Sequence, residues 1–151
     1  MASHLYGPAA KLIVDQALAL LTDTIKYGLS NSTHVPNKDD EFLDGGGADD
    51  FVDGELSGTG YTGGFGGSGR KTLASKTTVY DTANDRVEFD AADVVHSAID
   101  AGTIEHGMLL KEVTDDTDSV AIAEVDHPTT VTNGGDVTTQ WNAEGILQLT
   151  V

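Results

Sequence analysis

The side chains of this chain that could take part in chemistry are mainly carboxylates. The segment from Asp39 to Glu55 contains eight acidic residues and no basic residue, around three consecutive glycines. Clustered carboxylates bind hard cations such as Ca²⁺, but an EF-hand loop beginning at Asp49 would need Asp or Asn where Phe51 stands. The segment therefore favours a solvated loop over a designed cation site. Its weak candidates for cation ligands are Asp39, Asp40, Asp44, Asp49, Asp50 and Asp53.

Three histidines offer a second kind of chemistry. His96, His106 and His127 lie near the ends of three predicted strand regions, and imidazole both binds metals and titrates near neutral pH. If those strand ends meet, the three side chains could form a metal site or a pH sensor. The alternative, which we favour, is that they occupy independent positions at strand edges.

Two glycine motifs resemble phosphate-binding loops. The pattern G-x-G-x-x-G begins at Gly58 and again at Gly64, but a dinucleotide site needs a helix directly after the motif. Here the glycines lead into strand-forming residues 76–79. A P-loop is also excluded, because Arg70 separates Gly69 from the Lys-Thr pair that follows. Glycine in this segment therefore indicates bulges, close backbone approach or a mobile arm.

Common catalytic motifs are missing from the sequence. It has no G-x-S-x-G elbow, no H-E-x-x-H pair and no cysteine, so thiolate ligands and disulfides are excluded. The many acids leave a hydrolytic carboxylate pair open, but no pair is singled out. We therefore expect a non-enzymatic protein without a cofactor.

The elements that would position these side chains are mostly β-hairpins. Residues 76–81 and 86–91 alternate β-branched or aromatic side chains with polar ones, and the quartet 82–85 has turn-forming Asn and Asp. A second hairpin is predicted from residues 108–113 and 120–126, with an acidic tip.

A third hairpin, with a tight turn, is predicted to join residues 136–142 to residues 146–151. In this hairpin Trp141 lies in the core, opposite Leu147 and Leu149. The predicted core residues of this half of the chain are Val87, Phe89, Trp141, Leu147 and Leu149.

A helix is predicted before the hairpins. It begins at Pro8, extends to Leu21 and is largely buried, because apolar residues recur at helical spacing. The side chains of residues 24–29 then alternate in the pattern of a strand, and this segment is predicted as the first strand. Together these signals predict a mainly β fold, an antiparallel β-sandwich or barrel with one short N-terminal helix. We expect one domain over residues 1–151, with acidic and glycine-rich loops at about 36–70.

Charge limits the partners of the chain. It carries 25 acidic and 8 basic residues, a formal net charge of -17. Such a surface repels nucleic acid and anionic membranes, so we expect neither as a partner. In molar salt the repulsion is screened, which suits a halophilic setting; an ordinary acidic surface is the alternative. The apolar stretch 12–21 is too short to span a bilayer and lacks the features of a signal peptide.

Several short motifs, in order along the chain, carry a family resemblance. They are Leu5-Tyr6-Gly7-Pro8, Asp23-Thr24-Ile25-Lys26, Ser57-Gly58-Thr59-Gly60-Tyr61-Thr62, Lys76-Thr77-Thr78-Val79-Tyr80-Asp81, Val87-Glu88-Phe89-Asp90-Ala91-Ala92-Asp93-Val94, Asn133-Gly134-Gly135-Asp136, Gln140-Trp141-Asn142 and Gly145-Ile146. In these motifs the sequence resembles a family of small structural proteins encoded by tailed phages. It departs from the family pattern around Glu105-His106, and at His96 and His127, where the family usually has aromatic residues.

The resemblance implies a virion protein that decorates or cements the capsid surface, with the major capsid protein and further copies of itself as partners. The candidates for an interface are Tyr61, Phe65, Arg70 and Lys71. A tail-associated structural module is one alternative function. A carbohydrate-binding β-sandwich is another, which would need exposed aromatic side chains along a groove.

Overall fold

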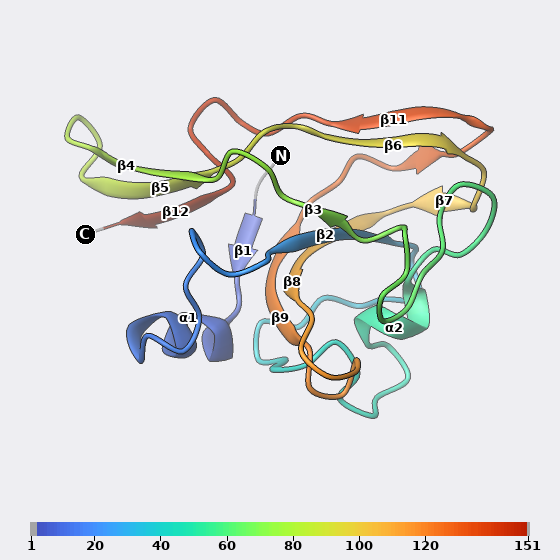
Figure 1. The fold of residues 1–151 in the computed structure, drawn as a ribbon, viewed down its shortest axis with the longest axis horizontal. Coiled ribbons are helices and arrows are strands. Elements are labelled where there is room, and N and C mark those ends of the chain that lie inside the picture. The colour runs from blue at the N-terminus through green and yellow to red at the C-terminus, as the bar shows by residue number, and fades with distance from the viewer. Residues whose placement is uncertain (1–2, 151) are drawn as a thin grey trace.

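The computed structural model describes residues 3–150, whose largest sheet has five antiparallel strands (Figure 1). In spatial order these are β1 (Ser3–Leu5), β9 (Val120–Val125), β8 (His106–Lys111), β2 (Lys26–Ser30) and β3 (Lys71–Thr72). The predicted second hairpin is confirmed, because β8 pairs with β9, with one register shift between Leu109 and Leu110. The central strands are buried along most of their length, so this sheet forms the middle of the molecule.

The predicted central hairpin is also confirmed and belongs to a second, three-stranded sheet. Its strands are β4 (Thr77–Asp81), β5 (Arg86–Asp90) and β12 (Leu147–Thr150), with β5 in the middle. The turn forms because the Asp81 carboxylate accepts the N–H groups of Ala83 and Asn84, while Asp85 adopts a positive φ of 49°. Figure 1 shows this sheet extending from the body at one end of the molecule. We call it the arm.

Two smaller sheets complete the β structure. Strand β6 (Val94–Ile99) pairs with β11 (Gly135–Thr139), and β7 (Thr103–Ile104) pairs with β10 (Thr130–Val131). All strand pairs are antiparallel, so the predicted mainly β architecture with one short N-terminal helix is confirmed. No closed barrel forms within residues 3–150.

The predicted third hairpin is wrong. The tight turn exists, with the Gly145 N–H donating to the carbonyl of Asn142 and a φ of 87° at Gly145. It does not fold β12 back on β11, however: β12 pairs with β5 and β11 pairs with β6. The apolar alternation of Leu147 and Leu149 is matched by Phe89 and Val87 across the arm.

The predicted helix is shorter and more exposed than the sequence suggested. Helix α1 spans Gly7–Val14, lies against β9, and buries only Ala9, while the side chain of Val14 is 81% exposed. It ends because the chain reverses at Gln16, whose φ is 60°. Residues 17–23 then form turns and bends without regular structure. The strand predicted at residues 24–29 is present as β2 (Lys26–Ser30), although it is the second strand and follows β1.

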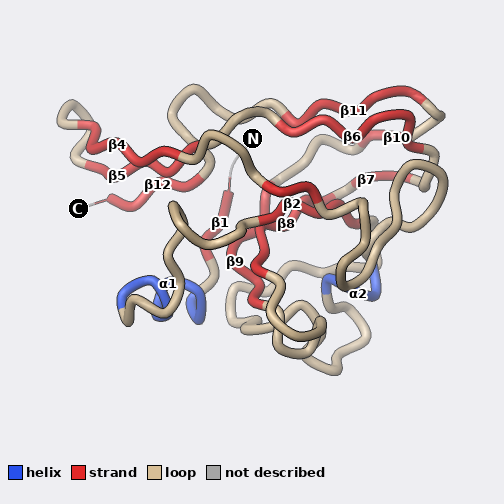
Figure 2. The backbone as a smooth tube through the Cα atoms, viewed as in Figure 1, coloured by secondary structure: helices blue, strands red, loops and turns tan. Residues whose placement is uncertain are grey.

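A second helix, α2 (Phe51–Gly54), is a single turn between the long loops shown in tan in Figure 2. No helix within residues 3–150 is long and apolar enough to cross a membrane.

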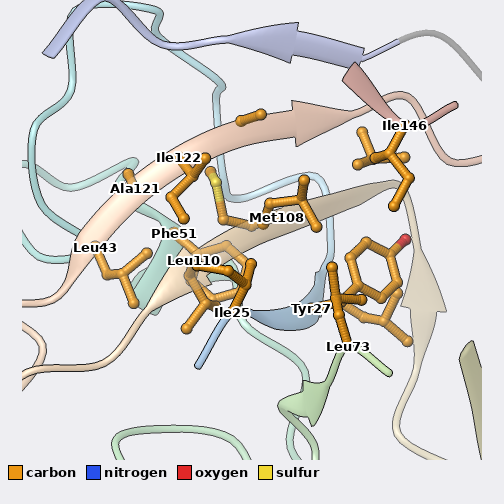
Figure 3. Close-up of a cluster of buried hydrophobic side chains, with 14 of the residues drawn as sticks. Ile25, Tyr27, Leu43, Phe51, Leu73, Met108, Leu110, Ala121, Ile122 and Ile146 are labelled. Atoms are coloured by element: carbon orange, nitrogen blue, oxygen red, sulfur yellow. The ribbon is translucent and has the colours of Figure 1, made fainter. Parts of the chain in front are cut away.

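The apolar core lies between the five-stranded sheet and the segments that cover it. Figure 3 shows side chains from distant parts of the chain meeting there, from Ile25 and Tyr27 of the N-terminal third to Ile146 near the C-terminus. Of the predicted core residues, Phe89 and Leu147 are buried. Val87 is half-buried and Leu149 is 36% exposed, because the outer half of the arm extends beyond the core.

Trp141 packs on the core but not opposite Leu147 and Leu149 as predicted. Its ring meets Tyr27 edge to face at 5.1 Å between centroids, and its Nε1–H donates to the carbonyl of Ala92 over 2.9 Å. The indole is half-buried. It therefore fastens the segment after β11 to the residues before β6 and, through Tyr27, to the five-stranded sheet, the main sheet of the molecule.

Trp141→Ala should lower the free energy of unfolding by about 3 kcal/mol, because it removes an aromatic contact and a hydrogen bond together. Because Trp141 is the single tryptophan, its fluorescence reports this site alone. The emission of the folded protein should lie to the blue of the unfolded protein. An identical emission maximum in both states would place the indole in water.

Candidate functional site

One face of the arm is apolar. In the register of the arm, Thr78 lies opposite Phe89, and Val87 lies opposite Leu149. Side chains alternate between the two faces of a sheet, so these four residues share one face. Phe89 is buried at the base of the arm, whereas Tyr80, which lies opposite Val87 towards the tip, is 53% exposed. The apolar face is thus covered at the base of the arm and open towards its tip.

The segment after α1 forms the other wall of a groove. Gln16, at its positive φ, turns the chain so that residues 18–22 run beside the arm. The groove between them has a volume of about 600 Å³. The lining residues share the absence of charge: Ile13, Gln16, Leu18, Ala19, Leu20, Leu21, Thr22, Thr78, Val87, Phe89 and Leu149. We call this feature the arm groove.

The arm groove is unusual for this acidic chain because it carries no charge. The protein carries a net charge of -17, yet no lining residue is ionisable. Leu21 and Leu149 are partly exposed at its edges. Contiguous exposed apolar surface on a soluble protein commonly marks a contact with another protein.

The sequence did not point to this groove, because residues 12–21 carry apolar residues at helical spacing. That pattern predicted a continuous buried helix, whereas the apolar residues after Gln16 line an open groove. The half-exposed strand residues Val87 and Leu149 were predicted as core. A helix-ending signal at Gln16 is not visible in the residue types, since glutamine rarely adopts a positive φ.

A buried cluster of charges lies around Arg70, directly before β3. Its guanidinium has no exposed surface and donates two bonds to Glu55, 2.8 Å from Nε and 2.7 Å from Nη2. It donates two more to Asp116 at 2.6 and 3.2 Å, and one to Glu112 at 3.2 Å. Arg70 therefore neutralises part of the charge of three acids from two distant segments, and Lys26 also pairs with Glu112.

The same carboxylates hold the glycine-rich loop. Glu55 accepts the N–H of Gly64 at 2.8 Å, Asp116 that of Phe65 at 3.1 Å, and Glu112 that of Gly66 at 3.0 Å. Burial alone would lower the pKa of Arg70, but its bonds to Glu55 and Asp116 outweigh burial and raise the pKa. The guanidinium therefore stays charged and fixes the loop.

These contacts decide how the predictions for the segment 58–71 compare with the structure. Close backbone approach is confirmed: a Cβ on Gly69 would lie 2.3 Å from Cε1 of Tyr61, so only glycine fits. The alternative of a mobile segment is not favoured, because the carboxylates of the Arg70 cluster hold this loop to the body. Among the four interface candidates, Tyr61 and Arg70 are buried, so their side chains form no surface for a partner. Phe65 is partly exposed and Lys71 is half-buried.

The acidic loop does not assemble into a cation site. The best-placed carboxylate, Asp50, accepts the N–H groups of Gly45 and Gly47 at 2.9 and 2.8 Å and so braces its own loop. Within residues 3–150, no group of three or more His, Cys, Asp or Glu side chains is arranged to hold a metal ion. Of the candidates, Asp39, Asp40, Asp44, Asp49 and Asp50 lie in loops and Asp53 lies in α2.

The three predicted histidines lie in separate environments. His106 meets Glu124 at 3.0 Å, and His127 bonds to the carbonyl of Pro128. His96 is fully buried in the middle of β6, where its Nε2–H donates to the carbonyl of Gly69 over 2.9 Å. The ring stacks on Tyr61 at 5.5 Å, and its Nδ1 has no partner.

A fourth histidine, His34, was not singled out by the sequence. It is buried with its ring 5.7 Å from that of His106, and its Nε2 has no partner. Burial lowers the pKa of His34 and of His127, and it lowers the pKa of His96 to about 4. These imidazoles are therefore neutral packing groups near neutral pH.

Comparison of the chain with protein-family models, curated proteins and solved structures finds no match.

Proposed function

We propose that this chain is a non-enzymatic structural protein of a tailed virus, which attaches to the outer surface of the capsid and stabilises it. The observation that carries the proposal is the arm groove, an uncharged apolar surface on a chain of net charge -17. The sequence resemblance to small virion proteins of tailed phages supplies the setting. The partner is the major capsid protein, through an apolar loop or chain segment that fits the arm groove.

The charge distribution supports this kind of attachment. Long-range electrostatic attraction cannot hold an acidic protein on a neutral or acidic shell, so the contact has to gain its free energy from apolar burial. The arm groove offers that surface on two walls, from the segment 16–22 and from the arm. A loop seated between them buries apolar atoms on both sides without placing a charge in a dry site.

The shape of the molecule suits a clamp between shell subunits. The arm extends beyond the main sheet, while the Arg70 cluster and the core keep the body as one unit (Figure 1). A decoration protein of this kind adds buried interface across subunit boundaries. Separating the subunits then requires that interface to be broken, which opposes the pressure of packaged DNA.

The test is co-sedimentation of the purified protein with capsid shells in molar salt. Leu149→Glu places a charge in the arm groove and should weaken attachment about tenfold or more, since about 1.4 kcal/mol corresponds to tenfold. Val131→Glu is the matched control, because Val131 is 70% exposed on β10 and does not line the groove. Circular dichroism should show both variants folded. Equal attachment of the two variants would contradict docking through the groove.

Salt should strengthen both folding and attachment. The acidic groups behind the net charge of -17 repel one another at low salt, because the Debye length is about 30 Å at 10 mM. At about 1 M salt the Debye length is about 3 Å, and this repulsion is screened. The midpoint of urea unfolding and the fraction bound to shells should therefore both rise from dilute buffer to molar salt. Full retention on shells dialysed to about 10 mM salt would show that the acidity is incidental to assembly.

A further inference from the structure

The outer edge of the arm is a free strand edge. Strand β4 pairs with β5 on one side, and no strand within residues 3–150 pairs with its other side. All its residues except Asp81 are exposed. An unpaired edge presents N–H and C=O groups at the spacing that another strand requires.

This edge lacks the features that usually prevent strand addition. Edge strands are commonly protected by proline, lysine or a bulge. Residues Thr77 to Tyr80 contain none of these, and the pairing of β4 with β5 runs without a register shift. The exposed residues Val79 and Tyr80 also have high strand propensity. The edge is therefore open to a partner strand.

The charge along β4 selects that partner. Lys76 precedes the strand, residues 77–80 are uncharged, and Asp81 ends it, with Asp85 in the turn beyond. A second copy of the same strand running antiparallel brings the basic end of each copy beside the acidic end of the other. A parallel copy would instead place the two Asp81 carboxylates together, which is destabilising.

We infer that two copies of this chain associate through β4, pairing antiparallel about a twofold axis at Val79. In this register Val79 faces Val79 of the second copy, Thr78 faces Tyr80, and Thr77 faces Asp81. No like charges lie opposite each other. Lys76, whose Nζ also donates to the carbonyl of Asp23, faces Thr82 of the second copy, one position from Asp81.

The product is one continuous six-stranded antiparallel sheet. Because the twofold axis is perpendicular to that sheet, the Thr78 and Tyr80 faces of both copies lie on the same side. The two arm grooves then open on one face of the dimer. The inference goes beyond the proposed attachment and does not rest on it, since the β4 edge is free whether or not the groove binds a shell.

The first test is the mass of the protein in solution without shells, by analytical ultracentrifugation. At about 1 M salt and about 100 μM protein, we expect a mass approaching twice 15.7 kDa, and a single chain at low salt and low concentration. Val79→Lys places two lysines face to face on the axis and should abolish the dimer. Val131→Lys, at an exposed strand position outside the interface, should leave it intact.

A second pair of variants tests the register. Thr77→Lys places a cation opposite Asp81 of the second copy and should tighten the dimer several-fold, whereas Thr77→Asp should weaken it by a similar factor. A single chain under all conditions would overturn the inference, as would a dimer that tolerates Val79→Lys or responds equally to the two Thr77 variants. Attachment to shells is measured separately, so failure here leaves the proposed function standing.

Discussion

Replacing Arg70 with methionine should lower the free energy of unfolding by about 3–5 kcal/mol, the largest effect expected of any single side chain outside the apolar core. The guanidinium has no exposed surface and is bonded to Glu55, Glu112 and Asp116. Methionine fills a similar volume but leaves the nearly buried carboxylates of Glu55 and Asp116 without a cation, and Glu112 with Lys26 alone. Urea unfolding followed by far-UV circular dichroism in molar salt measures the loss.

Two further variants show that the effect comes from the charge cluster. Lys11→Met removes a solvent-exposed ion pair with Asp15 on α1 and should leave the unfolding midpoint nearly unchanged. Adding Glu55→Gln to Arg70→Met should recover part of the loss, since it removes one of the unpaired charges. A loss below about 1 kcal/mol for Arg70→Met would mean that water, rather than Arg70, compensates these carboxylates.

Acidification from pH 6.5 to 4 should destabilise the protein through its buried histidines. Burial lowers the pKa of His96 from 6.5 to about 4, and the bond to Gly69 offsets only part of that effect. The unfolded chain therefore binds this proton more readily than the folded one. The stabilisation is fully present above about pH 6.5 and is lost as the pH falls towards 4. At about 1.36 kcal/mol per pH unit, His96 accounts for up to about 3 kcal/mol.

The physical cause is the unpartnered Nδ1 of His96. Protonation would place a charge on a buried atom with no acceptor, next to the rings of Tyr27 and Tyr61. His96→Phe keeps an aromatic ring there and should flatten the pH dependence of the free energy of unfolding between pH 6.5 and 4. Part of the residual slope comes from His34 and His127, whose pKa values burial also lowers. An unchanged slope in the variant would exclude His96 as the source.

Local patterns in the sequence predicted the parts of the fold that are themselves local. The hairpins β4-β5 and β8-β9 follow from alternation on either side of a polar turn, and both form as expected. The third hairpin failed because a turn at Gly145 shows that the chain reverses but not which strand it meets next. Strand β12 meets β5, more than 50 residues earlier in the chain, where Phe89 and Val87 match its apolar side chains.

The candidate site was less visible than the fold, because it depends on exposure rather than residue type. Leu149 and Val87 have the residue types and spacing of core residues, and only the extension of the arm beyond the main sheet leaves them open. Arg70 was predicted as an interface residue, but its side chain is buried. Its three acidic partners come from residues 55, 112 and 116, and no spacing rule connects them.

The most direct measurement is electron cryomicroscopy of virions that carry the protein, prepared in molar salt. Attachment through the arm groove predicts density for this fold on the outer surface of the capsid, with the groove between β5 and the segment 16–22 facing the shell and a loop of the major capsid protein seated in it. Density on the tail, or a capsid-bound molecule whose arm groove faces solvent, would contradict the proposed attachment.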